Sequence, residues 1–258
     1  VEPAENGAYT VTAPTNRPDL TREVDLIEEV VRLWGEGDIT PTLPAARNHA
    51  GGLTVDQQRI RKIGRTLRAC GLSETTTYCF ADANDLSKLG MSEEGRGIPV
   101  KIINPLVADQ AEMRRSILPG LLRSVAYNLD HGVDAVALYE IGRVFFGHEN
   151  KSQPDEPSFV CGVLSGHRDD EWCQKFEDYD FFDAKGVVEQ LLSALRVTKV
   201  RFKVADPQTY GWLQPGRAAE VYGNKGELMG WVGNIHPKAL KAFGVDAPVV
   251  AFELSVEA

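Results

Sequence analysis

The stretch AAEVYGNKGELMGWVGNI, residues 218–235, is typical of a β-hairpin. Its tip, GNKG, supplies the Asn and Gly that a tight turn needs at backbone positions with positive φ. Further strands are expected at 135–146, 158–166 and 249–257. Because helical segments separate these strands without a regular βαβ alternation, we predict an α+β fold with an antiparallel sheet flanked by helices.

The helices expected around this sheet are marked by caps. Thr54 and Gln57 form a capping box at the start of a helix that ends at Gly71. Asp183 is a candidate cap for a helix over 181–197, and His236 for a short helix that follows it. A helix is also expected at 118–132, and further strands at 74–81 and 98–104.

Composition limits the class of protein. The chain has 258 residues, 43% of them hydrophobic, and a formal net charge of −9. No apolar run approaches the roughly 18 residues of a membrane helix, and the N-terminus is not typical of a signal peptide. The acidic balance argues against a broad nucleic-acid surface. The basic run 59–68 is better explained as the solvated face of a helix.

Catalytic and metal-binding motifs are not evident in most of the chain. GxSxG, HExxH and Walker patterns are all missing from the sequence. Cys70, Cys79, Cys161 and Cys173 lack CxxC spacing, so we interpret them as buried, reduced thiols.

The N-terminal part has a different pattern. A strand at 8–14 precedes a helix for which Asp19 is a candidate N-cap and which Gly35 ends. The run 39–54 is rich in Pro, Gly and Ala and lacks periodicity. We therefore expect a domain boundary there, with domains at 1–45 and 46–258.

The expected N-terminal helix carries an unusual number of acids. The segment DLTREVDLIEEV, residues 19–30, holds five carboxylates and one basic residue. Asp25, Glu28 and Glu29 span about 100° of helical arc, away from the apolar stripe, and Asp19 could reach them from the cap. Such oxygen donors suit Mg²⁺ or Ca²⁺ better than Zn²⁺. A solvated acidic face is the alternative, because Glu28 and Arg32 have the i,i+4 spacing of a favourable pair and Arg22 can reach Asp25. Spacing alone favours this alternative.

Seven segments in order resemble the β subunit of bacterial phenylalanine–tRNA ligase. TAPTNRPDLTREVDLIEEVVRLWG is similar to the end of its B5 domain, which is winged-helix-like. The similarity to its catalytic-like domain rests on NPLVADQAEMRRSILPGLLRSVAYNLDHG, ALYEIGRVFF, FFDAKGVVEQLL, QPGRAAEV, GWVGNIHPKAL and VVAFELSVE. The resemblance implies a class II synthetase-like sheet and a truncated B5 segment. It also implies a fragment that lacks the editing domain expected before it and the anticodon-binding module expected after it.

The resemblance also implies partners and a cofactor. The family pairs this subunit with a catalytic α subunit in an (αβ)₂ assembly, which uses ATP to attach phenylalanine to tRNA. A Mg²⁺ shared with the α subunit would be bound by acids that correspond to Asp19, Asp25, Glu28 and Glu29. Glu23 lies roughly opposite Asp25 on the helix and is left out of this set. With the resemblance, the metal site becomes favoured over the solvated face.

We therefore expect a cytoplasmic, non-catalytic segment with no membrane or DNA partner, inactive in isolation. Arg143 resembles an arginine that contacts ATP in class II enzymes, but AFELSVEA stands where a Gly-rich strand ending in Arg would be. An adenylate site needs several cationic groups, which argues against catalysis here. A self-sufficient class II-like ligase and a nucleic-acid-binding module are the two alternatives.

Overall fold

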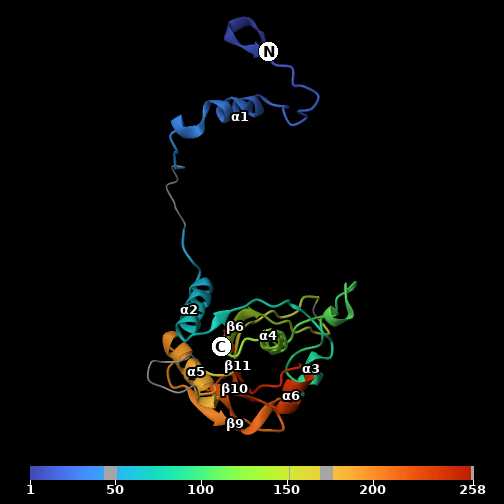
Figure 1. Ribbon diagram of the computed structural model, residues 1–258, viewed down its shortest axis with the longest axis vertical. Coiled ribbons are helices and arrows are strands. Elements are labelled where there is room, and N and C mark those ends of the chain that lie inside the picture. The colour runs from blue at the N-terminus through green and yellow to red at the C-terminus, as the bar shows by residue number, and fades with distance from the viewer. Residues whose placement is uncertain (44–50, 151, 169–176, 257–258) are drawn as a thin grey trace. The chain divides into compact units, whose positions relative to one another are not determined.

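The computed structural model describes residues 1–43, 51–150, 152–168 and 177–256. The chain divides into two compact units, Val1–Gly52 and Leu53–Ala258, whose elements are labelled in Figure 1. The expected boundary between residues 45 and 46 lies outside the described residues, as does Cys173.

The N-terminal unit is small. Strands β1 (Glu2–Pro3) and β2 (Tyr9–Thr10) pair antiparallel, and helix α1 covers Glu23–Trp34. The expected strand at 8–14 is therefore limited to two residues. Helix α1 ends before Gly35, whose φ of 107° stops the helix as predicted. No residue of α1 is buried.

A seven-stranded sheet forms the C-terminal unit, in the order β3-β6-β7-β11-β10-β9-β8. Its pairs are antiparallel except β3 with β6, which is parallel. The α+β prediction is confirmed, with a mixed rather than purely antiparallel sheet. The strands are β3 (Ser73–Glu74), β6 (Val136–Arg143), β7 (Ser158–Ser165), β8 (Arg201–Val204), β9 (Leu213–Tyr222), β10 (Leu228–Ile235) and β11 (Val249–Ser255).

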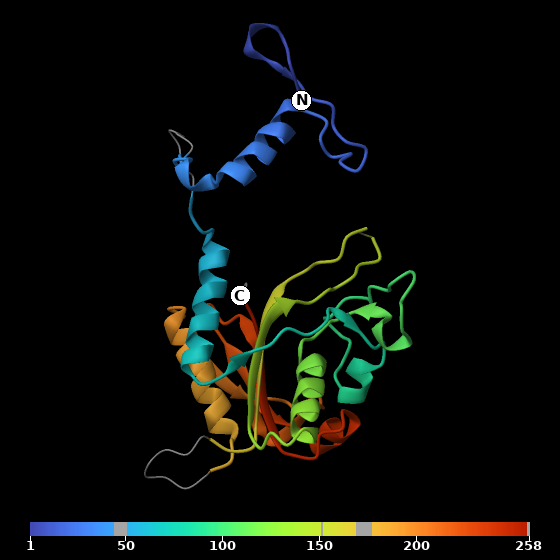
Figure 2. The ribbon, with the colours of Figure 1, turned by 45° about the horizontal axis from the view of Figure 1, so that its top comes forward.

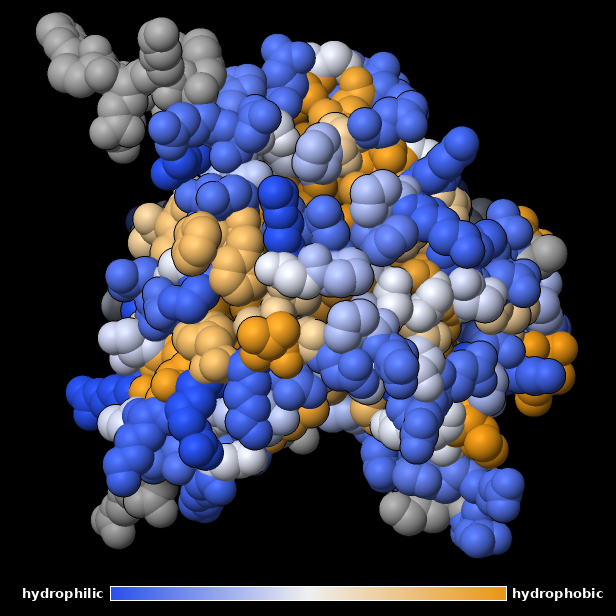
Figure 3. Space-filling view, turned by 90° about the horizontal axis from the view of Figure 1, so that it is seen from below, coloured by the Kyte–Doolittle hydropathy of each residue, from blue (hydrophilic) through white to orange (hydrophobic). Residues whose placement is uncertain are grey.

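Helices cover both faces of this sheet (Figure 2). Helices α2 (Val55–Ala69) and α5 (Phe181–Ala194) pack on one face. Helices α3 (Asp85–Leu89), α4 (Leu118–Asp130) and α6 (Pro237–Ala242) pack on the other. On the surface drawn in Figure 3, hydrophilic side chains surround smaller apolar patches. None of the described helices is long and apolar enough to cross a membrane.

Strand β11 shows why the central strands are continuously apolar. Alternate side chains of a strand point to opposite faces. Val249 and Ala251 therefore enter the core beneath α4, whereas Val250, Phe252 and Leu254 enter the core beneath α2 and α5. Both faces of this middle strand are buried, so its sequence lacks the polar alternation of a strand with one wet face.

The predicted hairpin is confirmed as β9 and β10. Tyr222 pairs with Leu228, and the Gly223 amide donates to the Glu227 carbonyl at 3.0 Å. Gly226 has the positive φ that the turn requires, 83°. Asn224 has a negative φ, so only the glycine fulfils that part of the prediction.

Two expected strands are wrong in extent. The run 74–81 divides between β3, which joins the large sheet, and β4 (Phe80–Ala81), which pairs with β5 (Glu112–Met113). The chain crosses from one sheet to the other between them, so neither sheet extends the strand. Residues 98–104 form only two isolated bridges, at Ile98 and Lys101.

The predicted caps are partly confirmed. Thr54 and Gln57 form the capping box of α2, with bonds of 3.0 and 3.2 Å. The His236 side chain accepts from the Lys238 amide at the start of α6. The cap of α5 is Asp180 rather than Asp183, which instead accepts a bond from the Asp180 amide.

The prediction for the cysteines holds in part. Cys70, Cys79 and Cys161 are free thiols. Only Cys161 is fully buried, and burial raises the pKa of its thiol well above the usual value. Cys70 and Cys79 are half-buried.

Candidate functional site

Helix α1 begins at Glu23, three residues later than an Asp19 cap would give. Arg22 is the N-cap residue, and the cap bonds come from the Asp25 side chain. Its carboxylate accepts from the backbone amides of Arg22 at 2.7 Å and Thr21 at 2.9 Å. The Thr21 bond first, and then the Arg22 bond, lower the pKa of Asp25 below its usual value. Asp25 is thus held as an anion at the helix start.

Asp19 and Glu29 come together on one arginine. The Arg17 Nη2 lies 2.6 Å from Asp19 Oδ2 and 2.6 Å from Glu29 Oε1. Asp19 and Glu29, which lie 10 positions apart in the sequence, therefore each place a carboxylate oxygen against the same guanidinium nitrogen. The hydrogen bond from Arg17 lowers the pKa of Asp19. Two of the four predicted metal ligands are thus close enough to share one cation.

Glu29 is the most strongly stabilised anion of the cluster. Besides Arg17, Arg32 donates to its Oε2 at 2.6 Å. The Arg17 bond first, and then the Arg32 bond, lower the pKa of Glu29 to about 2. Arg32 was expected to pair with Glu28 by helical spacing, but it pairs with Glu29. Glu28 is exposed and has no ion pair among the described residues.

The acidic cluster is therefore a charge network of carboxylates and arginines. Arg17, Arg22 and Arg32 supply three positive charges beside the four predicted carboxylates. Within the described ranges, no group of three or more acidic, His or Cys side chains is arranged to hold a metal ion. The convergence of Asp19 and Glu29 on Arg17 Nη2 gives an incomplete set of oxygen donors. Their chemistry fits Mg²⁺, and further ligands would have to complete the set.

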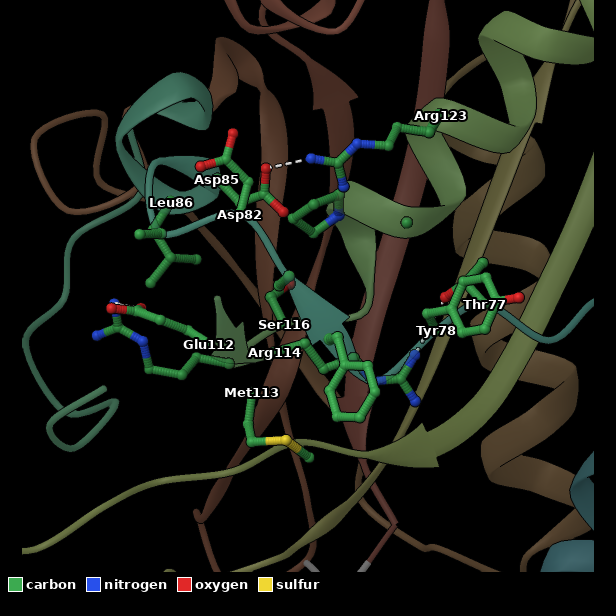
Figure 4. A pocket seen from close by; sticks show the side chains of 16 residues that line it. Thr77, Tyr78, Asp82, Asp85, Leu86, Glu112, Met113, Arg114, Ser116 and Arg123 are labelled. Atoms are coloured by element: carbon green, nitrogen blue, oxygen red, sulfur yellow. Dashed lines mark hydrogen bonds and ion pairs between the residues drawn. The ribbon is translucent and has the colours of Figure 1, made fainter. Parts of the chain in front are cut away.

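A second polar network lies inside the C-terminal unit, around the pocket in Figure 4. Arg114 and Glu140 form an ion pair at 2.6 Å, with side chains only 6% and 3% exposed. The second oxygen of Glu140 accepts from the Thr77 hydroxyl at 2.7 Å. Arg114 Nε also donates to the Arg143 carbonyl at 2.9 Å. The pair is thus buried and well hydrogen-bonded on both sides.

Charged side chains occupy most of this pocket and leave little free volume in it. Asp85 on α3 binds Arg123 on α4, as Figure 4 shows. Arg115, whose side chain is 3% exposed, lies 3.4 Å from a carboxylate oxygen of Glu93. The remaining space is about 30 Å³, too little for an organic substrate. One ion pair therefore joins α3 to α4, and the other joins Arg114, just after β5, to β6.

Sequence reasoning did not single out Arg114, Glu140 or Arg123. The usable signal was the pair of arginines, Arg114 and Arg115, directly before the apolar start of α4. Arg143, the residue compared with an ATP-binding arginine, is 61% exposed and pairs with Glu156 at 2.8 Å.

Two family models together match nearly the whole chain. The one described as "Phenylalanyl tRNA synthetase beta chain CLM domain" matches residues 39–256, and the one described as "tRNA synthetase B5 domain" matches residues 1–35. The chain belongs to the phenylalanyl-tRNA synthetase β-chain family. The order of the two matches follows the order of the two units.

Curated relatives carry the same family name. The phenylalanine–tRNA ligase β subunit of Syntrophotalea carbinolica is 37% identical over 100% of this chain and 32% of its own length. Those of Geobacter sulfurreducens and Bacillus licheniformis are 37% and 38% identical over 98% and 99% of this chain. They are matched over 32% and 31% of their own lengths. The chain spans about a third of the phenylalanyl-tRNA synthetase β chains it matches.

Proposed function

We propose that this chain is a non-catalytic segment of a phenylalanine–tRNA ligase, the cytoplasmic enzyme that uses ATP to attach phenylalanine to its tRNA. The family match over both units carries this proposal. The name "beta subunit" of the relatives supports a partner α subunit, which would form and use the aminoacyl-adenylate. An (αβ)₂ assembly and a class II synthetase-like sheet belong to the same proposal.

The polar interior supports a structural rather than a catalytic role. Arg114 and Glu140 neutralise each other and leave no room for a substrate between them. Arg143 neutralises an exposed carboxylate instead of facing a phosphate pocket. An adenylate needs cationic groups that are free to offset its charge.

Isolated-chain activity tests this point directly. We expect the 258-residue chain alone to give no phenylalanine-dependent exchange of pyrophosphate into ATP. Exchange should appear when an α subunit and the full-length β subunit are combined. Exchange by the chain alone would show a self-sufficient ligase instead. Tight, salt-sensitive binding of tRNA by the chain alone would favour the nucleic-acid module.

We further propose that Asp19, Asp25, Glu28 and Glu29 contribute to a Mg²⁺ site completed by the α subunit. The shared contact of Asp19 and Glu29 with one Arg17 nitrogen supports this, because one cation can replace another between two carboxylates. When bound, the metal would supply positive charge that links the two subunits. Arg17 would have to turn away as the metal binds.

A double substitution in the full-length β subunit tests the metal site. Asp25→Asn with Glu29→Gln should raise the Mg²⁺ concentration needed for assembly with α, measured by analytical ultracentrifugation. Glu23→Gln is the matched control, because it removes an acid of the same helix that lies outside the set. Equal assembly of both variants and the wild type across the Mg²⁺ titration would refute the shared site.

A further inference from the structure

A short segment after α3 is fastened at both ends and loosely held between them. We call this segment, residues 92–97, the strap. Before it, Met91 is buried in the core, only 4% exposed. After it, Ile98 and Gly147 exchange two backbone hydrogen bonds of 3.0 Å. Among the described residues, the backbone amides of the strap donate only to acceptors within the strap. Segments with so few bonds to the rest of a fold open at low cost.

The strap borders a hollow of about 380 Å³. Ser92, Glu94, Gly95 and Arg96 line it from the strap. Its other lining residues include five aromatic ones, Phe146, Phe159, Tyr210, Trp212 and Trp231. Residues far apart in the sequence thus border one space, so a movement of the strap would change how much of that space is open to solvent.

Arg96 is the one residue of the strap that is not exposed. Its guanidinium carbon lies 6.0 Å from the centroid of the Trp212 ring, and its Nη1 donates to the Arg115 carbonyl at 3.0 Å. Burial lowers the pKa of Arg96, and attraction to Glu253 partly opposes that shift. The strap therefore contacts the folded core through a cation that is partly removed from water.

A second arginine holds the strap from the core side by longer contacts. The Arg115 side chain is 3% exposed, and its Nη2 lies 3.4 Å from Glu93 Oε1. Its Nη1 donates to the Gly97 carbonyl at 3.5 Å. Glu93 is 62% exposed, so solvent weakens its ion pair. Long contacts of this kind are weak, which leaves the bond of Arg96 as the shortest tie between strap and core.

Two glycines give the strap a turning point and a fixed point. Gly95 and Gly97 both have positive φ, 75° and 63°. A Cβ at Gly95 would meet no atom within 4 Å, whereas one at Gly97 would lie 2.7 Å from the Gly147 carbonyl oxygen. The backbone therefore has room to turn at Gly95, while Gly97 is packed against the fastened end.

We propose that the strap is a lid over the aromatic hollow and that Arg96 is its latch. In the closed state, which the structure shows, Arg96 lies over Trp212 and binds the Arg115 carbonyl. In the open state the guanidinium returns to water, which removes its desolvation cost, and the hollow opens on the side of the strap. One hydrogen bond and one cation–π contact are thus opposed by desolvation, so the two states are close in free energy.

Acrylamide quenching of tryptophan fluorescence tests the latch in the 258-residue chain. Trp34→Phe and Trp172→Phe restrict the signal to Trp212 and Trp231, which are each 3% exposed. In this background Arg96→Gln should raise the quenching constant at least twofold, because the strap spends more time open.

Proteolysis shows where the chain opens. A glutamyl endopeptidase cleaves after Glu93 and Glu94, and both are exposed in the strap. Arg96→Gln should speed cleavage at these two sites several-fold, because cleavage follows the population of the open state. Arg143→Gln is the matched control, since it removes an exposed arginine that does not line the hollow, and it should change neither measurement.

The proposal requires both changes in Arg96→Gln, and the absence of either one would overturn it. Equal effects of Arg96→Gln and Arg143→Gln would overturn it as well. Faster cleavage throughout the chain, together with a lower urea midpoint, would show a general loss of stability and also refute the latch. None of these outcomes bears on the non-catalytic role proposed above, because neither measurement uses a substrate or the α subunit.

Discussion

The buried ion pair between Arg114 and Glu140 should be the most sensitive electrostatic contact in the C-terminal unit. Glu140→Gln keeps the size of the side chain but leaves the Arg114 charge uncompensated at 6% exposure. Removing one partner of such a pair costs about 3–5 kcal/mol. That is a large part of the roughly 5–15 kcal/mol that stabilises a typical domain.

The assay is urea unfolding followed by circular dichroism. With a slope of about 1–3 kcal/mol per molar urea, the midpoint should fall by at least about 1 M. Glu156→Gln is the matched control, because it breaks the Arg143 pair at 61% and 41% exposure. An exposed pair contributes about 0–1 kcal/mol.

A double-mutant cycle with Arg114→Met separates the ion pair from other effects. The double variant should be less destabilised than the sum of the two single variants, because it leaves no buried charge alone. The reasoning is refuted if Glu140→Gln and Glu156→Gln cost the same, or if the two substitutions are additive.

Two further results are expected. Gly142→Ala should destabilise the chain by about 1–3 kcal/mol, because the new Cβ would lie 2.1 Å from Arg114 Nη2. Gly186→Ala on α5 is the control: its new Cβ would meet no atom within 4 Å, so this variant should be as stable as the wild type or more stable. Thermal melts compare the two variants. Arg17→Gln should raise the pKa of Glu29 from about 2 toward 4.5, followed by NMR titration. Because the folded pKa is the lower one, the stability it contributes is present above pH 4.5 and is lost as pH falls toward 2; an unchanged pKa would refute the role of Arg17.

Local signals predicted much of the framework. The hairpin of β9 and β10, strand β11, and the caps Thr54 and His236 all follow from residue types at short spacing. Such features depend on turns and on bonds within a few residues, which a sequence displays directly. The prediction of a single strand at 74–81 is wrong because the two ends of this segment pair with strands of two different sheets.

The acidic helix shows the limit of helical spacing. The sequence indicated which side of α1 carries carboxylates. However, helical spacing predicted an ion pair between Arg32 and Glu28, and Asp19 was the predicted N-cap. In the structure Arg32 binds Glu29, and Asp25 makes the cap bonds. Several pairings have similar energies at an exposed helix surface, so spacing alone does not choose between them.

The sequence by itself determined the family and the α+β class. Only the tertiary structure decided which polar groups are buried and with what partners. Glu140 and Glu253 are both glutamates within apolar strands, yet Glu140 is paired with Arg114, whereas one oxygen of Glu253 has no partner among the described residues. The difference comes from residues more than 20 positions away, which meet each glutamate only when the chain packs.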